Sequence, residues 1–470
     1  MKFKCMTNRD ERNHRIGIIV FSVFLLFSPF LSEAREGDPV TLTINSKIRY
    51  QTIEGWGATL TGLGAIPIQE WLKDPTPEAY DRLQIQDSVS DELKSKIMDD
   101  AVFGLGLNRF RLEIGPQVKM RKTKIDPEKI NYENFRFKWQ DFKITKWLLP
   151  LKERIEQRGD PMVLYISYDL RSRLTPSWLL QPKEYAEMAV VVLTHLKKMY
   201  NLEPNYWSVL NEPGNHRPGS PESVAELIVR TGKRIKEAGF RTRMSGPEVV
   251  NPKQITAYMK ALSLTPGALK QMGQLTYHLY GDPMNIPQRN EIRNWAQKLG
   301  ITTAQTEWLE GRELNVVEAL FLDLTEANAS AWEQYGFSGG EGDYFVIQPV
   351  LSSYRMNKNS WYLRQIMNYI RPGDVRMMIS SSSPVIKPLA FLKPDGRQTV
   401  AIINSDPSPI SVQIENLAPE TYEVILTDSK NKGKRLPQEY ITSGQPLLFE
   451  IPPRAIVTFY CTKGIAQSVQ

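Results

Sequence analysis

The stretch Tyr206-Trp-Ser-Val-Leu-Asn-Glu-Pro213 is a short apolar run that ends in a carboxylate, Glu212. A second run, Ile301-Thr-Thr-Ala-Gln-Thr, ends in the same way at Glu307, 95 residues after Glu212. One strand–helix repeat of an α/β barrel takes roughly 30 residues, so this spacing fits three repeats. Strand ends three repeats apart lie across the mouth of a closed barrel, where the two carboxylates would face each other.

The remainder of residues 51–370 alternates between similar runs and amphipathic segments. Runs rich in β-branched and aromatic residues predict eight strands, at 53–58, 107–114, 162–168, 206–210, 242–245, 274–280, 302–306 and 329–335. The clearest helix between them begins after the capping residue Ser220, has Pro221 in its first turn and stops at Gly239. Eight strand–helix units predict an α/β fold of the (β/α)8 TIM barrel type.

After residue 370 the pattern changes to short apolar runs separated by turns such as Pro394-Asp395-Gly396. This pattern predicts a side β-sandwich domain over residues 371–464, with strands at 385–392, 398–404, 410–414, 422–427, 447–451 and 455–460. Residues 37–50 also alternate, and they precede the first barrel strand. We expect them to pair with the sandwich, which would then be built from both ends of the chain.

Residues 1–34 have the pattern of a secretory signal peptide. Basic residues precede an apolar run at 16–31, and Ser32-Glu33-Ala34 supplies small residues at a cleavage site. We expect cleavage near Ala34 and a secreted or periplasmic protein, without stable membrane insertion of the mature chain. The alternative is an uncleaved anchor, because the apolar run approaches the length that spans a bilayer.

The residue inventory argues against several classes of protein. The net charge of +7 is not concentrated in one run, which indicates a solvated surface and no nucleic-acid partner, although it would also suit acidic glycans. With Cys5 in the leader, Cys461 has no partner for an internal disulfide. His195, His216 and His278 form no metal-binding motif, and no dinucleotide or phosphate-loop fingerprint occurs. We predict neither metal nor cofactor, and we expect a monomer.

Two facing carboxylates are what glycoside hydrolysis requires. In this interpretation Glu212 is the general acid/base and Glu307 is the nucleophile. Asn211 would hold the 2-hydroxyl of the sugar, a contact that strengthens in the transition state. Arg111 is a cation inside the second predicted strand and needs a carboxylate partner. Glu307 is the natural partner, because ion pairing would keep a nucleophile ionised.

Aromatic and further acidic side chains flank the same strand ends. Flat rings suit the apolar faces of sugars, so we predict substrate contacts for Trp178, His278, Tyr280, Trp308 and Trp332. The alternative for these rings is packing in the core. Competing carboxylates within or at the ends of strands are Glu113, Asp169 and Asp282, none of which has a partner at the spacing of the first pair.

With these motifs in place, the chain resembles glycoside hydrolase family 30 over about residues 40–462. That family includes glucosylceramidases, β-1,6-glucanases, β-1,6-galactanases and xylanases. The resemblance is carried by Gln51-Thr-Ile-Glu-Gly-Trp-Gly-Ala-Thr-Leu-Thr61, Arg111-Leu-Glu-Ile-Gly115, Asn211-Glu212-Pro213, His278-Leu-Tyr280, Thr306-Glu307 and Tyr369-Ile-Arg-Pro-Gly373. It implies retention of configuration and no cofactor.

The chain departs from that family at two places. Gly115-Pro116-Gln117-Val118 stands where the family often continues with Ser-x-Asp-Phe, and Trp308 follows the nucleophile position. Both departures favour a β-linked oligosaccharide or polysaccharide as substrate. Two alternatives stay open, a barrel that binds glycan without turning it over and a glucosylceramidase-type glycolipid hydrolase.

Overall fold

The computed structural model describes residues 38–60, 68–71, 73–85, 87, 89–124, 126, 128–169, 175–215, 219–339, 346–347, 354 and 356–461. The predicted leader and its cleavage site lie outside these residues. Within the described residues, no helix combines the length and the apolar content needed to cross a membrane.

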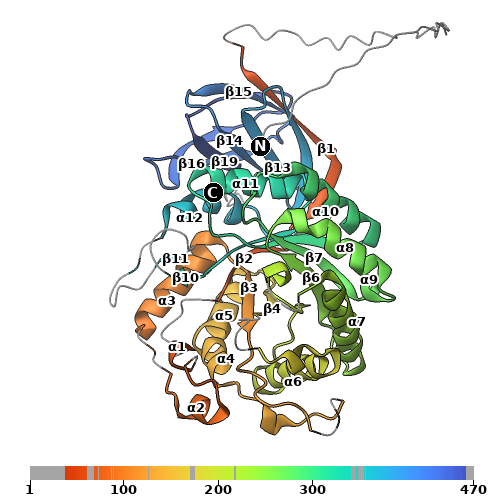
Figure 1. The fold of residues 1–470 in the computed structure, drawn as a ribbon. Coiled ribbons are helices and arrows are strands. Elements are labelled where there is room, and N and C mark those ends of the chain that lie inside the picture. The colour runs from red at the N-terminus through yellow and green to blue at the C-terminus, as the bar shows by residue number, and fades with distance from the viewer. Residues whose placement is uncertain are drawn as a thin grey trace, which may run out of the picture. The chain divides into compact units, whose positions relative to one another are not determined.

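Eight parallel strands close into a barrel in the order in which they occur along the chain (Figure 1). They are β2 (Gly55–Thr59), β3 (Arg109–Ile114), β4 (Val163–Tyr168), β5 (Tyr206–Ser208), β6 (Arg243–Val249), β7 (Met272–His278), β8 (Thr302–Glu307) and β9 (Ala331–Gln334). The last strand closes the barrel by pairing with the first, with Ala331 opposite Gly55. The predicted α/β barrel is confirmed, and all eight strands fall within two or three residues of their expected positions, apart from the C-terminal end of β6.

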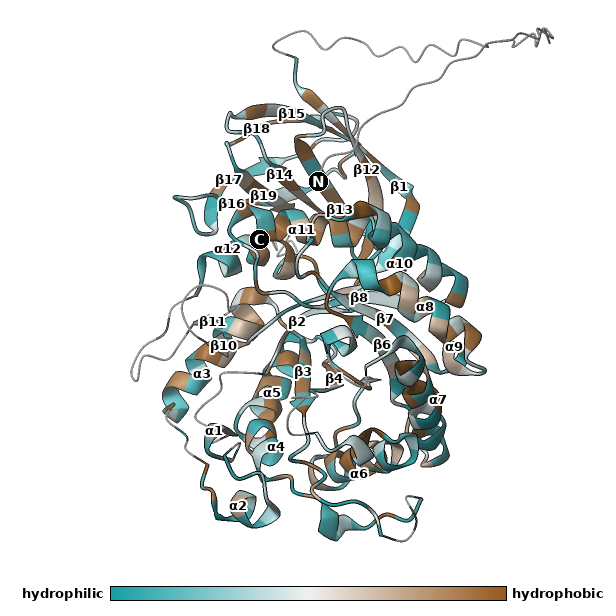
Figure 2. Cartoon of the chain, in the orientation of Figure 1, coloured by the Kyte–Doolittle hydropathy of each residue, from teal (hydrophilic) through white to brown (hydrophobic). Residues whose placement is uncertain are grey.

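The helices of the structure begin and end at local sequence signals, and α7 is an example. They are α1 (Ile68–Trp71), α2 (Pro77–Arg82), α3 (Asp91–Asp99), α4 (Lys138–Lys143), α5 (Leu149–Arg158), α6 (Pro182–Tyr200), α7 (Pro221–Glu237), α8 (Ile255–Leu264), α9 (Ala268–Gln271), α10 (Ile286–Leu299), α11 (Leu314–Thr325) and α12 (Lys358–Met367). In α7 the hydroxyl of Ser220 accepts a hydrogen bond from the Ser223 N–H at 3.2 Å, and Gly239 takes a left-handed φ of +83° just beyond the end. Its buried side chains recur at helical spacing, so one face of the helix is apolar and the other hydrophilic (Figure 2).

A nine-stranded sheet forms the β domain, in the order β17-β16-β19-β14-β13-β12-β1-β15-β18. Its strands are β1 (Val40–Thr52), β12 (Val375–Ser381), β13 (Ile386–Leu392), β14 (Gln398–Asn404), β15 (Ile410–Glu415), β16 (Thr421–Thr427), β17 (Lys434–Tyr440), β18 (Leu447–Ile451) and β19 (Ala455–Tyr460). The N-terminal strand β1 runs antiparallel to β12 and parallel to β15. The sheet curls around its own apolar core, as a side β-sandwich requires.

The barrel and one face of the sheet share an apolar core. Successive residues of β13 point to opposite faces, so Leu389 and Phe391 belong to the core of the barrel while Ala390 belongs to that of the sheet. In the same way β14 sends Ala401 and Ile403 toward the barrel. Polar contacts add to this junction, because the Thr458 hydroxyl on β19 donates to the Gln365 carbonyl of α12 at 2.8 Å. The sheet is therefore packed against the barrel as a continuous structure.

A chain that ends before Val385 is expected to be insoluble or inactive. It would lose β13–β19, leave β1 and β12 with only each other as strand partners, and expose the barrel residues that Phe391 covers. Soluble yield, thermal unfolding and turnover measure this outcome. A milder pair of variants separates packing from truncation: Phe391→Ala should lower the free energy of unfolding by about 3–5 kcal/mol. Leu448→Ala, at a side chain that is 64% exposed, should lower it by less than about 1 kcal/mol. A soluble, fully active truncated barrel would contradict the shared core.

Candidate active site

The inward face of β3 carries charge. Because side chains alternate along a strand, Arg109, Arg111 and Glu113 all point into the barrel, and the two arginines are fully buried. Arg109 lies nearer the N-terminal end of the barrel strands. It pairs there with Glu333 and, at 3.0 Å, with Glu54. Arg111 lies one layer higher, toward the mouth of the barrel, and organises the site.

Every nitrogen of the Arg111 guanidinium has a partner. Its Nε donates to the Thr59 hydroxyl at 2.9 Å, and its Nη1 donates to Glu248 Oε1 at 2.9 Å and to Asn211 Oδ1 at 3.3 Å. Its Nη2 donates to Glu113 Oε1 at 3.0 Å and to Glu307 Oε2. A buried cation is stable only when it is paired and hydrogen-bonded, so this network fixes the positions of three carboxylates around one guanidinium.

Glu307 is the last residue of β8 and is 6% exposed. Each of its oxygens has its own donor: Arg111 bonds to Oε2, and the Tyr280 hydroxyl donates to Oε1 at 2.8 Å. Burial and the neighbouring Glu307 charge raise the pKa of Tyr280 well above its usual value, so this hydroxyl keeps its proton. The expected Arg111–Glu307 ion pair is present. Tyr280, which lies two residues beyond the end of β7, adds a third member to it.

Glu212 lies four residues beyond the last residue of β5, in a strained backbone conformation. Its φ of +47° falls in the left-handed region that favours glycine, and its N–H donates to the Glu248 carbonyl at 3.1 Å. The carboxylate is 17% exposed and contacts His278 Nδ1 at 3.0 Å through Oε1. Its other oxygen accepts a hydrogen bond from the Asn215 amide at 3.1 Å. A costly backbone angle that is held by a hydrogen bond commonly marks a functional position.

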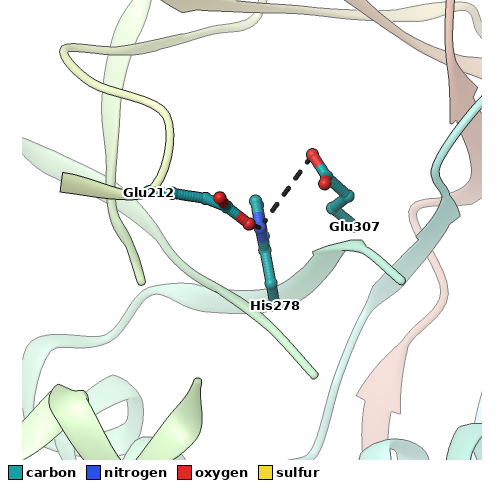
Figure 3. A group of neighbouring side chains, drawn as sticks. All are labelled: Glu212, His278 and Glu307. Carbon is teal, nitrogen blue, oxygen red and sulfur yellow. Dashed lines mark hydrogen bonds and ion pairs between the residues drawn. The ribbon is translucent and has the colours of Figure 1, made fainter. Parts of the chain in front are cut away.

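His278 stands between the two carboxylates. Figure 3 shows Glu212 and Glu307 on either side of its ring, and one ligand atom from each of the three residues lies within 4.8 Å of the others. Burial by itself would lower the pKa of His278, but the Glu307 charge and the hydrogen bonds to Glu212 and Glu248 outweigh it and raise the pKa to about 9. The imidazole is therefore protonated at neutral pH and adds a second cation beside Arg111.

Protonated His278 is expected to make stability depend on pH. Its pKa of about 9 in the folded state exceeds the value of about 6.5 in the unfolded chain. Its contribution is therefore full below pH ~6.5 and is lost as the pH rises through ~9, a change of a few kcal/mol in total. Urea unfolding at a series of pH values should detect this loss in the wild type and a much weaker one in His278→Gln. Coinciding pH dependences would contradict the assignment.

Glu248 is the site residue that the sequence analysis missed. It is fully buried, accepts from Arg111 and from the Ser167 hydroxyl at 3.0 Å, and lies 3.7 Å from His278 Nε2. Burial would raise the pKa of Glu248, but the neighbouring His278 and the Arg111 charge lower it, so it stays ionised. The predicted strand stopped at residue 245, before Gly246-Pro247, whereas β6 continues to Val249. Extending the inward and outward alternation of side chains from Ser245 would not have placed Glu248 inside the barrel either. The pairing of β6 with β7 shifts its register between Pro247 and Val249.

The competing carboxylates differ in their placement. Glu113 lies at the site beside Arg111, and burial raises its pKa despite that cation, with the Asp169 charge adding to the rise. Asp282 instead lies in a partly exposed loop after β7. It pairs with Lys253 at 2.9 Å and accepts from the Asn285 amide at 3.0 Å.

Two of the predicted aromatic contacts are placed in the core instead. Trp308 is 1% exposed and lies against Gly311 and Val316. Trp332 is fully buried, and its indole N–H donates to Asp323 of α11 at 2.9 Å. Strand alternation explains both: the neighbours Glu307 and Glu333 point inward, so the two tryptophans point outward to the helices. Their prediction as sugar contacts is corrected to core packing.

The remaining predicted contacts lie on the mouth side of the barrel. Trp178 is half-buried in the short helical turn Ser177–Leu180 that follows β4. Tyr280 is also half-buried and touches Glu307. Asn211 accepts from Arg111 through its oxygen, which leaves its amide N–H groups to donate elsewhere.

Glu212, His278 and Glu307 also have the spacing of a metal site. A metal would need a deprotonated imidazole and a free carboxylate oxygen. Here the raised pKa keeps His278 protonated, and Arg111 already bonds to Glu307 Oε2. The contacts fit an ion-paired organic site better than a metal centre.

A scan of known protein families finds no match to this chain, and a search of curated proteins finds none either. Solved structures do match. The catalytic domain of a GH30 xylanase C from Talaromyces cellulolyticus aligns with a TM-score of 0.68 at 18% identity, covering 90% of this chain and 100% of that one. A conserved exported protein from Bacteroides fragilis aligns at 0.66 and 15%, covering 90% and 100%. An endo-β1,6-glucanase aligns at 0.62 and 15%, covering 90% and 94%. The chain therefore has a GH30-like fold, as the sequence motifs predicted.

Proposed function

We propose that this protein is a retaining β-glycosidase that hydrolyses a β-linked oligosaccharide or polysaccharide. Glu307 acts as the nucleophile and Glu212 as the acid/base. The observation that carries the proposal is the placement of two carboxylates at strand ends of one barrel, with an oxygen of each within 4.8 Å of the other. Retaining enzymes hold their carboxyl groups about 5–5.5 Å apart, and inverting ones about 6.5–9.5 Å.

The contacts of Glu307 suit a nucleophile. Arg111 and Tyr280 donate to its two oxygens and hold the carboxylate in one orientation. In the first step an oxygen of Glu307 bonds to the anomeric carbon, and the glycosidic bond breaks. Glu212 gives its proton to the departing oxygen.

The second step reverses these roles. Glu212, now ionised, takes a proton from a water molecule, whose oxygen bonds to the anomeric carbon and displaces Glu307. The net reaction adds one water across one glycosidic bond. Two inversions at the same carbon retain its configuration. The amide of Asn211 would donate to the sugar near Glu212, and Trp178 and Tyr280 would offer rings to its apolar faces.

The similar structures include proteins described as a xylanase and as an endo-β1,6-glucanase, and both of those polymers are candidate substrates here. One similar structure is described as an exported protein, which agrees with the signal peptide expected at residues 1–34. We therefore propose a secreted or periplasmic enzyme that works on carbohydrate outside the cytoplasm.

A panel of aryl β-glycosides, xylan, β-1,6-glucan and β-1,6-galactan tests the proposal. Proton NMR should detect the β-anomer first, before mutarotation mixes the anomers. A chelator such as EDTA should leave the rate unchanged, since Arg111 and His278 supply the positive charge. The α-anomer as first product would mean inversion. Saturable glycan binding without turnover would identify a binding protein instead.

A further inference from the structure

Among the residues that the structure describes, one buried arginine lacks a carboxylate partner. Four arginines of the described chain are at least nine-tenths buried, and Arg109, Arg111 and Arg289 each pair with a carboxylate. The fourth, Arg376 on β12, is 7% exposed and has no carboxylate within 4.0 Å among the described residues. Its Nε donates to Gln51 Oε1 at 3.0 Å, and its two Nη groups donate to no described residue. A buried cation in this state is open to an anion.

The surroundings orient the guanidinium and leave its outer edge free. The amide of Gln51 donates to the carbonyls of Leu324 and Ala329 at 2.9 and 3.0 Å, which turns its oxygen toward Arg376. The Tyr50 ring centre lies 3.8 Å from the central carbon of the guanidinium. A stacked ring covers a face, whereas the N–H groups point outward in the guanidinium plane. Burial lowers the pKa of Arg376 to about 10, so the group is still charged at neutral pH.

A groove of about 290 Å³ opens beside this arginine, between α11 and strands β12 and β13. Phe321 and Thr325 line it from the helix, and Ser381, Ser383 and Lys387 line it from the sheet. Figure 1 places α11 against the sheet, outside the barrel that holds Glu212 and Glu307. The Lys387 amine is paired with Glu318 at 2.6 Å, so of the described residues that line the groove, Arg376 is the cation without a carboxylate partner.

We infer that Arg376 and this groove form a second binding site, which takes an oxyanion such as a carboxylate or sulfate group. The two Nη groups match the spacing of two oxyanion oxygens. The anion can come from an acidic sugar of a glycan or from a free inorganic salt. The inference does not rest on the proposed glycosidase activity.

Isothermal titration calorimetry on the full chain tests this site with glucuronate and with sulfate, each at constant ionic strength. Glucose and chloride are the matched probes without an oxyanion. We expect saturable binding of at least one oxyanion, and Arg376→Gln should weaken it at least about tenfold. Arg397→Gln, at an arginine in the turn between β13 and β14 that is already paired with Asp395 at 2.5 Å, should bind like the wild type.

Comparing the ligands distinguishes between the two sources of the anion. Binding of glucuronate but not glucose supports an acidic sugar, and binding of sulfate alone supports an inorganic anion. If Arg376→Gln does not fold, Arg376→Lys keeps the charge without the two-pronged donor set and should also bind more weakly. Equal binding by wild type, Arg376→Gln and Arg376→Lys would overturn the inference, and so would the absence of oxyanion binding in the wild type.

Discussion

Replacing Glu307 by Gln is expected to lower turnover on the order of 10⁵-fold, as the loss of a nucleophile does in other covalent catalysts. An amide oxygen is a poor nucleophile and cannot form the glycosyl ester. The protein should still fold, because Arg111 keeps Glu113 and Glu248 as partners. Residues at the mouth of a barrel serve function more than stability. Turnover on the best substrate of the panel and thermal unfolding measure the two effects.

A chemical rescue identifies the role of Glu307 more closely. In Glu307→Ala, azide can enter the space left by the carboxylate, bond to the anomeric carbon and displace an aryl leaving group. One displacement gives an α-glycosyl azide, with inverted configuration. Glu226→Gln, at an exposed glutamate of α7, is the control and should keep wild-type turnover. Near-normal activity of Glu307→Gln would end the assignment.

The barrel could be predicted because its signals are local. Each barrel strand is buried on both faces, so it appears in the sequence as a short continuous apolar run. Helices such as α7 carry their own start and stop residues. The strands that were missed lack such signals. Sheet strand β17, with sequence Lys434–Tyr440, is polar, contains Pro437 and lies at an edge of the sheet, where strands need few apolar residues. Strand β12 mixes Met and Ser and follows directly on the Pro372-Gly373 turn.

The site was predictable only in part. Glu212 and Glu307 could be placed because each ends an apolar run, and Arg111 because a cation inside a strand requires a partner. The contacts among them join residues far apart in sequence, such as Arg111 and Glu307, which are 196 residues apart. For this reason the sequence could not indicate that His278 lies between the two glutamates, or that Glu248 faces the same arginine. Trp308 was the avoidable error, since alternation beside an inward Glu307 turns it outward.

The charges at the site explain why these extra residues matter. Four carboxylates, Glu113, Glu212, Glu248 and Glu307, surround Arg111 and protonated His278. Carboxylates this close cannot all be ionised without cations between them. Arg111 contacts Glu307 directly, while His278 contacts Glu212, so each proposed catalytic residue has its own cation.

Replacing Glu212 by Ala is expected to slow hydrolysis by an amount that depends on the leaving group. A sugar leaving group needs the proton that Glu212 supplies, so turnover of a natural glycan should fall about 10²–10⁴-fold. A dinitrophenolate leaves without a proton, so the first step with a dinitrophenyl glycoside should be almost unaffected. The glycosyl ester on Glu307 should then accumulate, because the second step lacks its base, and a burst of dinitrophenolate should be seen.

Azide separates this variant from the one at Glu307. In Glu212→Ala, azide needs no base and should attack the ester on Glu307, which speeds up turnover and gives a β-glycosyl azide of retained configuration. The same reagent should give the α-azide with Glu307→Ala. Opposite configurations from the two variants would place the residues on opposite faces of the sugar ring, as double displacement requires. Azide products of the same configuration from both variants would contradict the roles assigned to Glu212 and Glu307. So would an equal fall in the rate of Glu212→Ala with the natural glycan and with the dinitrophenyl glycoside.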